Sequence, residues 1–350
     1  MARRGARSHS LQLATAAALT LPLALAACGG STPPAPAPPP PPPPAAAAAT
    51  ASADPVGMPA SPPTGTPTTP TAPGEPPAST PVWKVSEGIS TPESVLYDSV
   101  ADRYLVSNIN GSPTGVDNNG YISELSPDGK VVKAKFIEGG AGKTKLDAPK
   151  GTAISNGVLY VSDITVVRKF DAKTGAPKGD IPVKDAVFLN DIAIAPDGRV
   201  FVSDSGMKVG EKGLEPAGGD AVYVIDKAGK VKPVAKAKEL NAPNGLALLD
   251  KKLVVVALGS DEAYTLDDKG QKQDLTHLPK GGLDGVDVVG DELIISSWQG
   301  SAVYRGKLGG TFVPVLYGVK SPADIGFDSK RNRVLVPHFT ENSVEAFDLK

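Results

Sequence analysis

Residues 159–164 read Leu-Tyr-Val-Ser-Asp-Ile, an apolar run that ends in two small polar residues. A continuous apolar run of this length is typical of a β-strand that is buried on both faces. Five related segments occur between residues 82 and 350. In chain order they are Tyr104-Leu-Val-Ser-Asn-Ile, Val200-Phe-Val-Ser-Asp-Ser, Leu253-Val-Val-Val-Ala-Leu, Leu293-Ile-Ile-Ser-Ser-Trp and Val334-Leu-Val-Pro-His-Phe. Repeats of about 45 residues are typical of propeller blades.

The segments around each run indicate antiparallel hairpins. A shorter apolar stretch and a turn come first, as in Asp191-Ile-Ala-Ile-Ala followed by Pro196-Asp-Gly-Arg, and Asp-Gly between apolar runs favours a hairpin. We therefore predict an all-β, six-bladed β-propeller over residues 82–350, with three or four strands in each blade. The last repeat shows only three strands, so we expect residues 82–85 to supply its fourth strand and close the ring. A β-sandwich or a lipocalin-type barrel would not explain a sixfold repeat.

The first 27 residues resemble a secretion signal, with three arginines before an apolar stretch at 11–25. The signal ends in Leu25-Ala-Ala-Cys-Gly, which resembles the bacterial lipobox, so Cys28 is the expected lipidation site. The alternative is an ordinary signal followed by an incidental cysteine. Because Gly29 rather than Asp follows Cys28, we expect a lipid-anchored protein of the cell envelope, at the outer membrane and facing the periplasm or the surface.

Residues 28–81 are predicted to be a disordered linker. Positions 29–81 hold 20 of the 35 prolines, no aromatic residue and only two charged residues. Such a segment buries too little apolar surface to offset its ordering entropy, so it is interpreted as a spacer. Cys28 is the only cysteine, which excludes disulfides from the folded part. Loss of the signal would change the formal net charge from −2 to −5, which argues against a nucleic-acid partner. We expect a monomer that contacts the membrane only through its lipid.

One position just before each predicted inner strand aligns across all six repeats. The residues at this position are Glu93, Lys150, Asn190, Asn244, Asp284 and Ala323. Successive members are 57, 40, 54, 40 and 39 residues apart. Inner strands line the channel of a propeller, so these side chains are expected to converge at one mouth of the channel.

Two carboxylates and two amide oxygens in this column form a hard-oxygen site suited to Ca²⁺. The predicted metal ligands are Glu93, Asn190, Asn244 and Asp284, whose two negative charges one Ca²⁺ would neutralise. The alternative is that Asn-Gly and Asp-Gly are ordinary turn dipeptides whose side chains satisfy backbone amides. The ammonium of Lys150 either replaces the metal or points away from the ring.

The second strand of each blade is expected to end at the same mouth, and its last residues are Asn108, Asp163, Asp204, Ala257, Ser297 and His338. The Ser-Asp pairs among them are interpreted as strand caps. His338 is a candidate wall residue, proton shuttle or ligand. Two insertions at 107–120 and 204–220 emerge from this face and are candidates for a lid or a pocket rim.

Four of these motifs together resemble the senescence-marker/gluconolactonase (regucalcin-like) family over residues 83–350. They are Pro92-Glu-Ser-Val, Asn190-Asp, Pro243-Asn-Gly-Leu and Asp284-Gly-Val-Asp. The resemblance implies a calcium propeller in which Glu93, Asn244 and Asp284 bind the metal and Asn190 is a fourth ligand or a substrate contact. It also implies a second, structural ion at Asp287. The chain departs from the sugar lactonases at Phe188, where they have an arginine.

The activity implied is calcium-dependent hydrolysis of lactones or related esters. In this hypothesis the metal polarises the substrate carbonyl, and Asp284 activates water or attacks directly. Asn190 and His338 would orient the substrate, and Lys150 would contact it. The alternative function is a non-catalytic propeller that binds a ligand or a protein at the cell envelope, because propellers host many functions.

Overall fold

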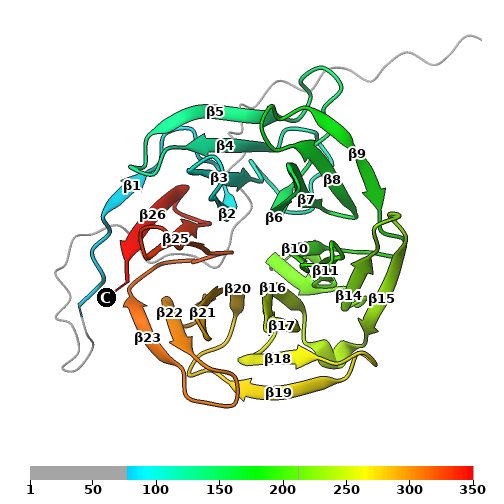
Figure 1. Cartoon of the computed structure of the whole chain (residues 1–350), viewed down its shortest axis with the longest axis vertical. Helices are drawn as coiled ribbons and strands as arrows, with labels where there is room; N and C mark the ends of the chain where they lie inside the picture. The colour runs from blue at the N-terminus through cyan, green and yellow to red at the C-terminus, as the bar shows by residue number, and fades with distance from the viewer. Residues whose placement is uncertain (1–76, 212, 350) are drawn as a thin grey trace, which may run out of the picture. The chain divides into compact units, whose positions relative to one another are not determined.

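The computed structural model describes residues 77–211 and 213–349. These residues form six four-stranded antiparallel sheets and one separate two-stranded hairpin. The sheets follow one another around a common centre (Figure 1), and in five of them the strand that comes first in the chain is innermost. The all-β, six-bladed propeller predicted from the repeats is confirmed.

The blades are numbered in chain order, and each of the first five uses consecutive strands apart from one inserted hairpin. Blade 1 contains β2 (Pro92–Asp98), β3 (Arg103–Asn108), β4 (Tyr121–Leu125) and β5 (Val131–Glu138), and blade 2 contains β6 (Pro149–Ser155), β7 (Val158–Asp163), β8 (Val166–Asp171) and β9 (Pro177–Pro182). Blade 3 contains β10 (Leu189–Ile194), β11 (Val200–Asp204), β14 (Ala221–Ile225) and β15 (Val231–Lys236), and a short 3₁₀-helix, η1 (Lys238–Leu240), follows it. Blade 4 contains β16 (Pro243–Leu249), β17 (Lys252–Ala257), β18 (Glu262–Leu266) and β19 (Lys272–His277), and blade 5 contains β20 (Leu283–Val289), β21 (Glu292–Ser297), β22 (Ala302–Gly306) and β23 (Val313–Tyr317).

Blade 6 joins the two ends of the propeller. Its strands are β24 (Gly326–Asp328), β25 (Arg333–His338), β26 (Ser343–Asp348) and the early strand β1 (Trp83–Val85). Strand β1 pairs antiparallel with β26, with Trp83 opposite Ala346 and Val85 opposite Val344. The predicted fourth strand therefore closes the ring, and the closure removes an edge that would otherwise expose unpaired backbone groups.

The inner strands form an unbroken ring around the channel. Each one contacts the inner strand of the next blade, from β2 through β6, β10, β16 and β20 to β24 and back to β2. At the closing point the backbone N–H of Asp324 donates to the carbonyl of Glu93 at 2.8 Å. The N–H of Val95 donates to the carbonyl of Asp324 at 3.2 Å.

Apolar side chains from neighbouring blades fill the space between the sheets. The second strands carry most of this core, and all six residues of β3 are buried. Between blades 3 and 4, for example, Phe201 and Val222 pack with Leu253, Val255 and Tyr264 in one cluster. Strands buried on both faces need continuous apolar sequence, which is why the repeated runs do not alternate.

The insertion at 204–220 contains a separate hairpin of β12 (Met207–Gly210) and β13 (Gly213–Pro216). The predicted signal, the lipidation site Cys28 and residues 28–76 of the predicted linker lie outside the described residues and remain predictions. Near the end of that linker, the N–H of Ser79 donates to the Tyr317 carbonyl at 2.9 Å, so these residues contact blade 5. No helix in the described part of the chain is long and apolar enough to cross a membrane.

Trp83 fastens the closing strand to the neighbouring blade. Its indole N–H donates to the carbonyl of Pro127 at 3.1 Å, and its ring lies 5.9 Å from that of Tyr104. A Cβ at Gly129 would lie 2.5 Å from the indole, so this turn has room for Trp83 only because it carries glycine.

We expect Trp83→Ala to lower the free energy of unfolding by about 2 kcal/mol, because a half-buried aromatic contact and a hydrogen bond are lost. Urea unfolding followed by far-UV circular dichroism measures the change. Val82→Ala is the matched control, because Val82 is 52% exposed and its loss should change stability by less than about 0.5 kcal/mol. Equal effects of the two substitutions would contradict a closing role for Trp83.

Candidate functional site

The polar column begins at an irregularity in the pairing of each inner strand. In blade 1 the pairing register shifts between Pro92 and Val95, so Glu93 falls in a bulge next to the second strand. Four other blades show the same shift, which places Lys150, Asn190, Asn244 and Asp284 in bulges too. A bulge turns a side chain out of the regular alternation of a strand.

Serines on the second strands fix the bulged residues of neighbouring blades. The hydroxyl of Ser203 accepts the N–H of Asp191 at 2.9 Å and donates to the carbonyl of Asn244 in the next blade at 2.6 Å. Ser296 in the same way accepts from Gly285 and donates to the carbonyl of Ala323, both at 2.8 Å. These buried bonds set the distance between successive column positions.

The Ser-Asp pairs at the ends of the second strands have a structural role, as predicted. Asp163 accepts the N–H of Ala148 at 2.7 Å, and Asp204 accepts the N–H of Phe188 at 2.8 Å. Asp163 also forms a 2.8 Å ion pair with Arg168. Their carboxylates are therefore already used by the loops that lead into the inner strands.

The four predicted ligands differ from these residues because each keeps one buried oxygen without a hydrogen-bond partner. The unpaired atoms are Glu93 Oε2, Asn190 Oδ1, Asn244 Oδ1 and Asp284 Oδ1. The four side chains are between 1% and 5% exposed. Because buried polar atoms nearly always have partners, four unpaired oxygens in one aligned position indicate a site for a cation.

The other polar atoms of two of these side chains are held by neighbours. The Asn190 Nδ2 donates to the hydroxyl of Ser205 at 3.2 Å, which assigns Oδ1 as the free atom of the amide. The indole N–H of Trp298 donates to Asp284 Oδ2 at 2.7 Å, and Oδ1 is left free. Each contact fixes which oxygen remains available.

Burial and mutual repulsion raise the pKa values of the carboxyl groups in this region. Burial, followed by the negative charges of Asp284 and Asp324, raises the pKa of Glu93 well above its ordinary value. Burial and Asp324 raise the pKa of Asp284 to about 8, although the Trp298 hydrogen bond acts in the opposite direction. Burial raises the pKa of Asp191 to about 7. A bound cation would relieve this excess of negative charge.

The ammonium of Lys150 lies outside the set of free oxygens. It donates to the carbonyl of Ala148 at 3.0 Å and lies 4.5 Å from the centre of the Phe188 ring. The four free oxygens accept no hydrogen bond from Lys150, so the ammonium does not pair with any of them.

His338 has one hydrogen-bonded ring nitrogen and one, Nε2, that faces a carboxylate without forming a hydrogen bond. Its Nδ1 lies 2.6 Å from the carbonyl oxygen of Lys320, and its Nε2 lies 3.1 Å from the carboxylate of Glu345 on β26. The side chain thus links strands within blade 6. Asp287, considered for a second ion, has its two oxygens occupied by the N–H groups of Val288 at 2.7 Å and Phe327 at 2.9 Å.

Three residues of the site were not identified from the sequence: Trp298, Asp191 and Asp324. Asp191 and Asp324 follow the column position directly, and each is packed against a glycine at the same position of the preceding blade. A Cβ on Gly151 would lie 2.4 Å from Asp191 Oδ1, and one on Gly285 would lie 2.7 Å from Asp324 Oδ1. The available signal was that the position after the column holds Gly in three blades and Asp in two, Asp191 and Asp324.

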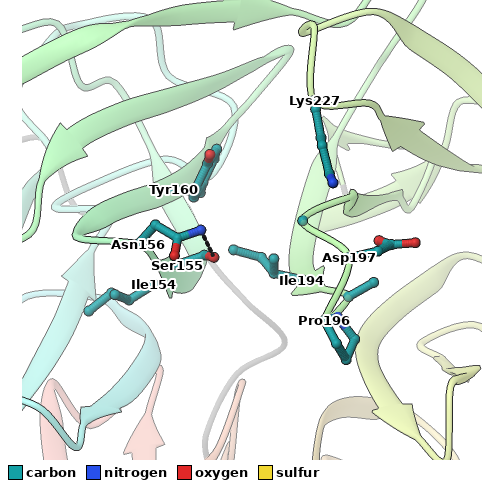
Figure 2. Close-up of a pocket in the computed structure, with 10 residues that line it drawn as sticks. Ile154, Ser155, Asn156, Tyr160, Ile194, Pro196, Asp197 and Lys227 are labelled. Atoms are coloured by element: carbon teal, nitrogen blue, oxygen red, sulfur yellow. Dashed lines mark hydrogen bonds between the residues drawn. The ribbon is translucent and has the colours of Figure 1, made fainter.

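A cavity of about 670 Å³ lies between blades 2 and 3, at the opposite end of their inner strands from the free oxygens (Figure 2). Its lining includes Tyr160, Asp197 and Lys227, and Asp197 is paired with Arg199 at 2.8 Å. This cavity shares no residue with the column.

No three His, Cys, Asp or Glu side chains within residues 77–211 and 213–349 form a metal-binding group. The candidate site depends instead on two amides and two carboxylates, Asn190, Asn244, Glu93 and Asp284.

Comparison with known proteins identifies the fold. No family model and no curated protein matches the sequence. Among solved structures, a gluconolactonase from Xanthomonas campestris matches with a TM-score of 0.55 and 18% identity, covering 78% of this chain and 88% of that one. This chain has the six-bladed propeller fold of the gluconolactonases. The same gluconolactonase-type propeller matches luciferin-regenerating enzyme (TM-score 0.53, 15% identity, 72% and 85% covered) and virginiamycin B lyase from Staphylococcus aureus (0.52, 13%, 77% and 99%).

The raised pKa values of this gluconolactonase-type propeller predict how its stability depends on pH without a cation. A carboxyl group whose pKa is raised on folding stabilises the protein while it is protonated, and this contribution is lost as the pH rises through the folded pKa. With the pKa of Asp284 at about 8, we expect the metal-free protein to lose stability between about pH 5 and pH 8. Thermal melts in chelator measure this, and Asp284→Asn should have a shallower dependence. Identical pH profiles would contradict the shifted pKa.

The Trp298 contact predicts a second result. Trp298→Phe removes the N–H that favours the ionised form of Asp284, so we expect its pKa to rise and Ca²⁺ affinity at pH 7 to fall about tenfold. Isothermal titration calorimetry measures the affinity. Trp83→Phe is the control, because it makes the same change at a tryptophan whose contacts, Pro127 and Tyr104, include no column residue. Unchanged affinity in the Trp298 variant would show that Asp284 is oriented without it.

Proposed function

We propose that this chain is a calcium-dependent hydrolase of lactones or related esters that acts at the mouth of the propeller channel. The observation that carries the proposal is the set of four buried oxygens without partners, one from each of four blades. The gluconolactonase-type fold supports the reaction class, although fold alone does not determine chemistry.

The residues present suit Ca²⁺ better than other common metals. Glu93 and Asp284 supply carboxylate oxygens, and Asn190 and Asn244 supply amide oxygens, all of which are hard ligands. The described column contains no thiolate or imidazole, the ligands that favour zinc or copper. The two carboxylates together balance one divalent charge.

Bound calcium would supply Lewis-acid polarisation of the substrate carbonyl. Asp284 is proposed to accept the proton of the attacking water, and in support its carboxylate is buried and bonded to Trp298 through one oxygen only. The water oxygen bonds to the carbonyl carbon, the ring C–O bond breaks, and Asp284 returns its proton to the leaving alkoxide, so that the product is a hydroxy acid. The amide of Asn190, oriented by Ser205, positions the substrate.

His338 is proposed as a wall residue of blade 6 with no proton-transfer step. Its Nδ1 lies against the Lys320 carbonyl and its Nε2 against the Glu345 carboxylate, and these contacts hold the ring in blade 6. Trp298 lies beside Phe339, with ring centres 5.5 Å apart, and this aromatic pair adjoins Asp284. We propose that it forms an apolar wall for the substrate.

We expect Asp284→Asn to fold normally but to lose more than about a hundredfold in kcat/KM towards lactones, since a general base contributes about that much. A panel of lactones and aryl esters, assayed with Ca²⁺ and with chelator, measures this. Asp163→Asn is the matched carboxylate control, because Asp163 caps a strand, and its effect should appear in stability rather than in turnover. Full turnover by the Asp284 variant would contradict its role.

Calcium should also raise the melting temperature of the wild-type protein, because a ligand that binds only the folded state stabilises it. Mg²⁺ at the same concentration is the control, since it binds poorly without near-ideal octahedral geometry. A protein that showed neither a calcium shift nor hydrolysis would instead be a binding propeller.

A further inference from the structure

Lys150 is a buried lysine whose charge the proposed reaction does not use. Its side chain is 1% exposed and enters the inner ring from blade 2. The ammonium makes one hydrogen bond, to the carbonyl of Ala148, and lies over the face of Phe188. An ammonium has three donors, so two N–H groups have no hydrogen-bond acceptor among the described residues.

No carboxylate oxygen in the described part of the chain lies within 4.0 Å of the Lys150 ammonium, although buried lysines normally have an ionic partner. The negative charge of Glu93, followed by that of Asp163, acts to raise the pKa of Lys150 and so stabilises its charged form. Asp163 is already paired with Arg168 at 2.8 Å. Burial lowers the pKa of Lys150 to about 8, which reflects this incomplete compensation.

A cation among the four free oxygens would weaken the attraction between the Glu93 carboxylate and the Lys150 ammonium. Glu93 is one of the four ligands, so its negative charge would be shared with the cation. The Lys150 ammonium would then lie beside a second positive charge. A negatively charged group between the two would stabilise both of them.

The residues around the ammonium are held in place without a ligand. Ala148, which accepts from Lys150, is fixed by its own N–H bond to Asp163 at 2.7 Å. Phe188 is fixed by an N–H bond to Asp204 at 2.8 Å. A charge held in position by buried groups loses little entropy when it binds an anion.

We propose that Lys150 and Phe188 form a subsite for a carboxylate, so that the preferred substrate is a lactone or ester that carries a carboxylate near its reacting carbonyl. Lys150 binds the carboxylate oxygens, and the ring of Phe188 contacts the carbon skeleton. The binding part of this inference stands on the Lys150 geometry, and the substrate part rests on the proposed hydrolase function.

Benzoate and its neutral analogue benzamide test the subsite independently of turnover. In calcium-containing buffer at pH 7, we expect the wild-type chain to bind benzoate at least about tenfold more tightly than benzamide, the typical effect of a charge-assisted hydrogen bond. Isothermal titration calorimetry measures both. Lys150→Met should remove the preference, and Lys150→Gln is the second variant in case the first does not fold. Lys145→Met, a change of the same charge at an exposed lysine in the preceding loop, should retain it.

Absence of a benzoate preference in the wild type would overturn the subsite, as would a preference that persists in the Lys150 variants. The wild-type comparison decides the matter even if both variants fail to fold, because a carboxylate subsite requires the preference.

Two lactones that differ only in charge test the substrate class: γ-butyrolactone-γ-carboxylate and the corresponding carboxamide. We expect the wild type to hydrolyse the carboxylate with at least about tenfold higher kcat/KM, and Lys150→Met to lose this ratio while its rate on the carboxamide changes less than about threefold. Benzoate preference without hydrolysis of either lactone would overturn the hydrolase proposal and leave the subsite. Equal hydrolysis of both lactones would overturn the substrate class and leave the hydrolase.

Discussion

Closure of the ring of inner strands is the constraint on which the rest of the structure depends. Blade 6 is completed by β1 from the start of the folded part, and its first residues bond through the backbone to Glu93 in blade 1. The four free oxygens come from blades 1, 3, 4 and 5, so their arrangement depends on every blade being in place. Opening the ring at blade 6 would separate Glu93 from Asp284 and would expose strand edges at the same time. Stability and the proposed chemistry therefore depend on the same closure.

The buried polar residues of this propeller form two groups, those whose side chains have hydrogen-bond partners within the fold and those that keep a free oxygen. Asp163 and Asp204 bind backbone amides with their carboxylates, and Ser203 links the inner strands of two blades. Asp191 also joins two blades, because its carboxylate accepts the N–H of Leu246 at 2.6 Å. These groups have their partners within the fold. Glu93, Asn190, Asn244 and Asp284 instead leave one oxygen each without a partner, at a cost in folding free energy that a bound cation would offset.

The six-bladed propeller fold does not by itself select a function. Similar structures include a gluconolactonase, luciferin-regenerating enzyme and virginiamycin B lyase, so the fold accompanies different reactions. Hydrolysis is proposed from the chemistry of the column, and a charged substrate is proposed from Lys150. The aromatic ring of Phe188 lies next to that ammonium, so a positive charge and an apolar surface are adjacent there.

The sequence alone determined the propeller, its six blades, the closing strand and the alignment of the column, because each depends on a pattern that recurs at a regular spacing. It also identified Asp163 and Asp204 as caps, since residues of this kind satisfy loop amides locally. The sequence did not reveal that Trp298 binds Asp284, that the charge of Asp324 raises the pKa of Asp284, or that His338 contacts Glu345 within blade 6. It left the direction of the Lys150 ammonium open. Those features depend on which side chains from distant parts of the chain approach one another and on the rotamers they adopt, and only the closed tertiary structure decides both.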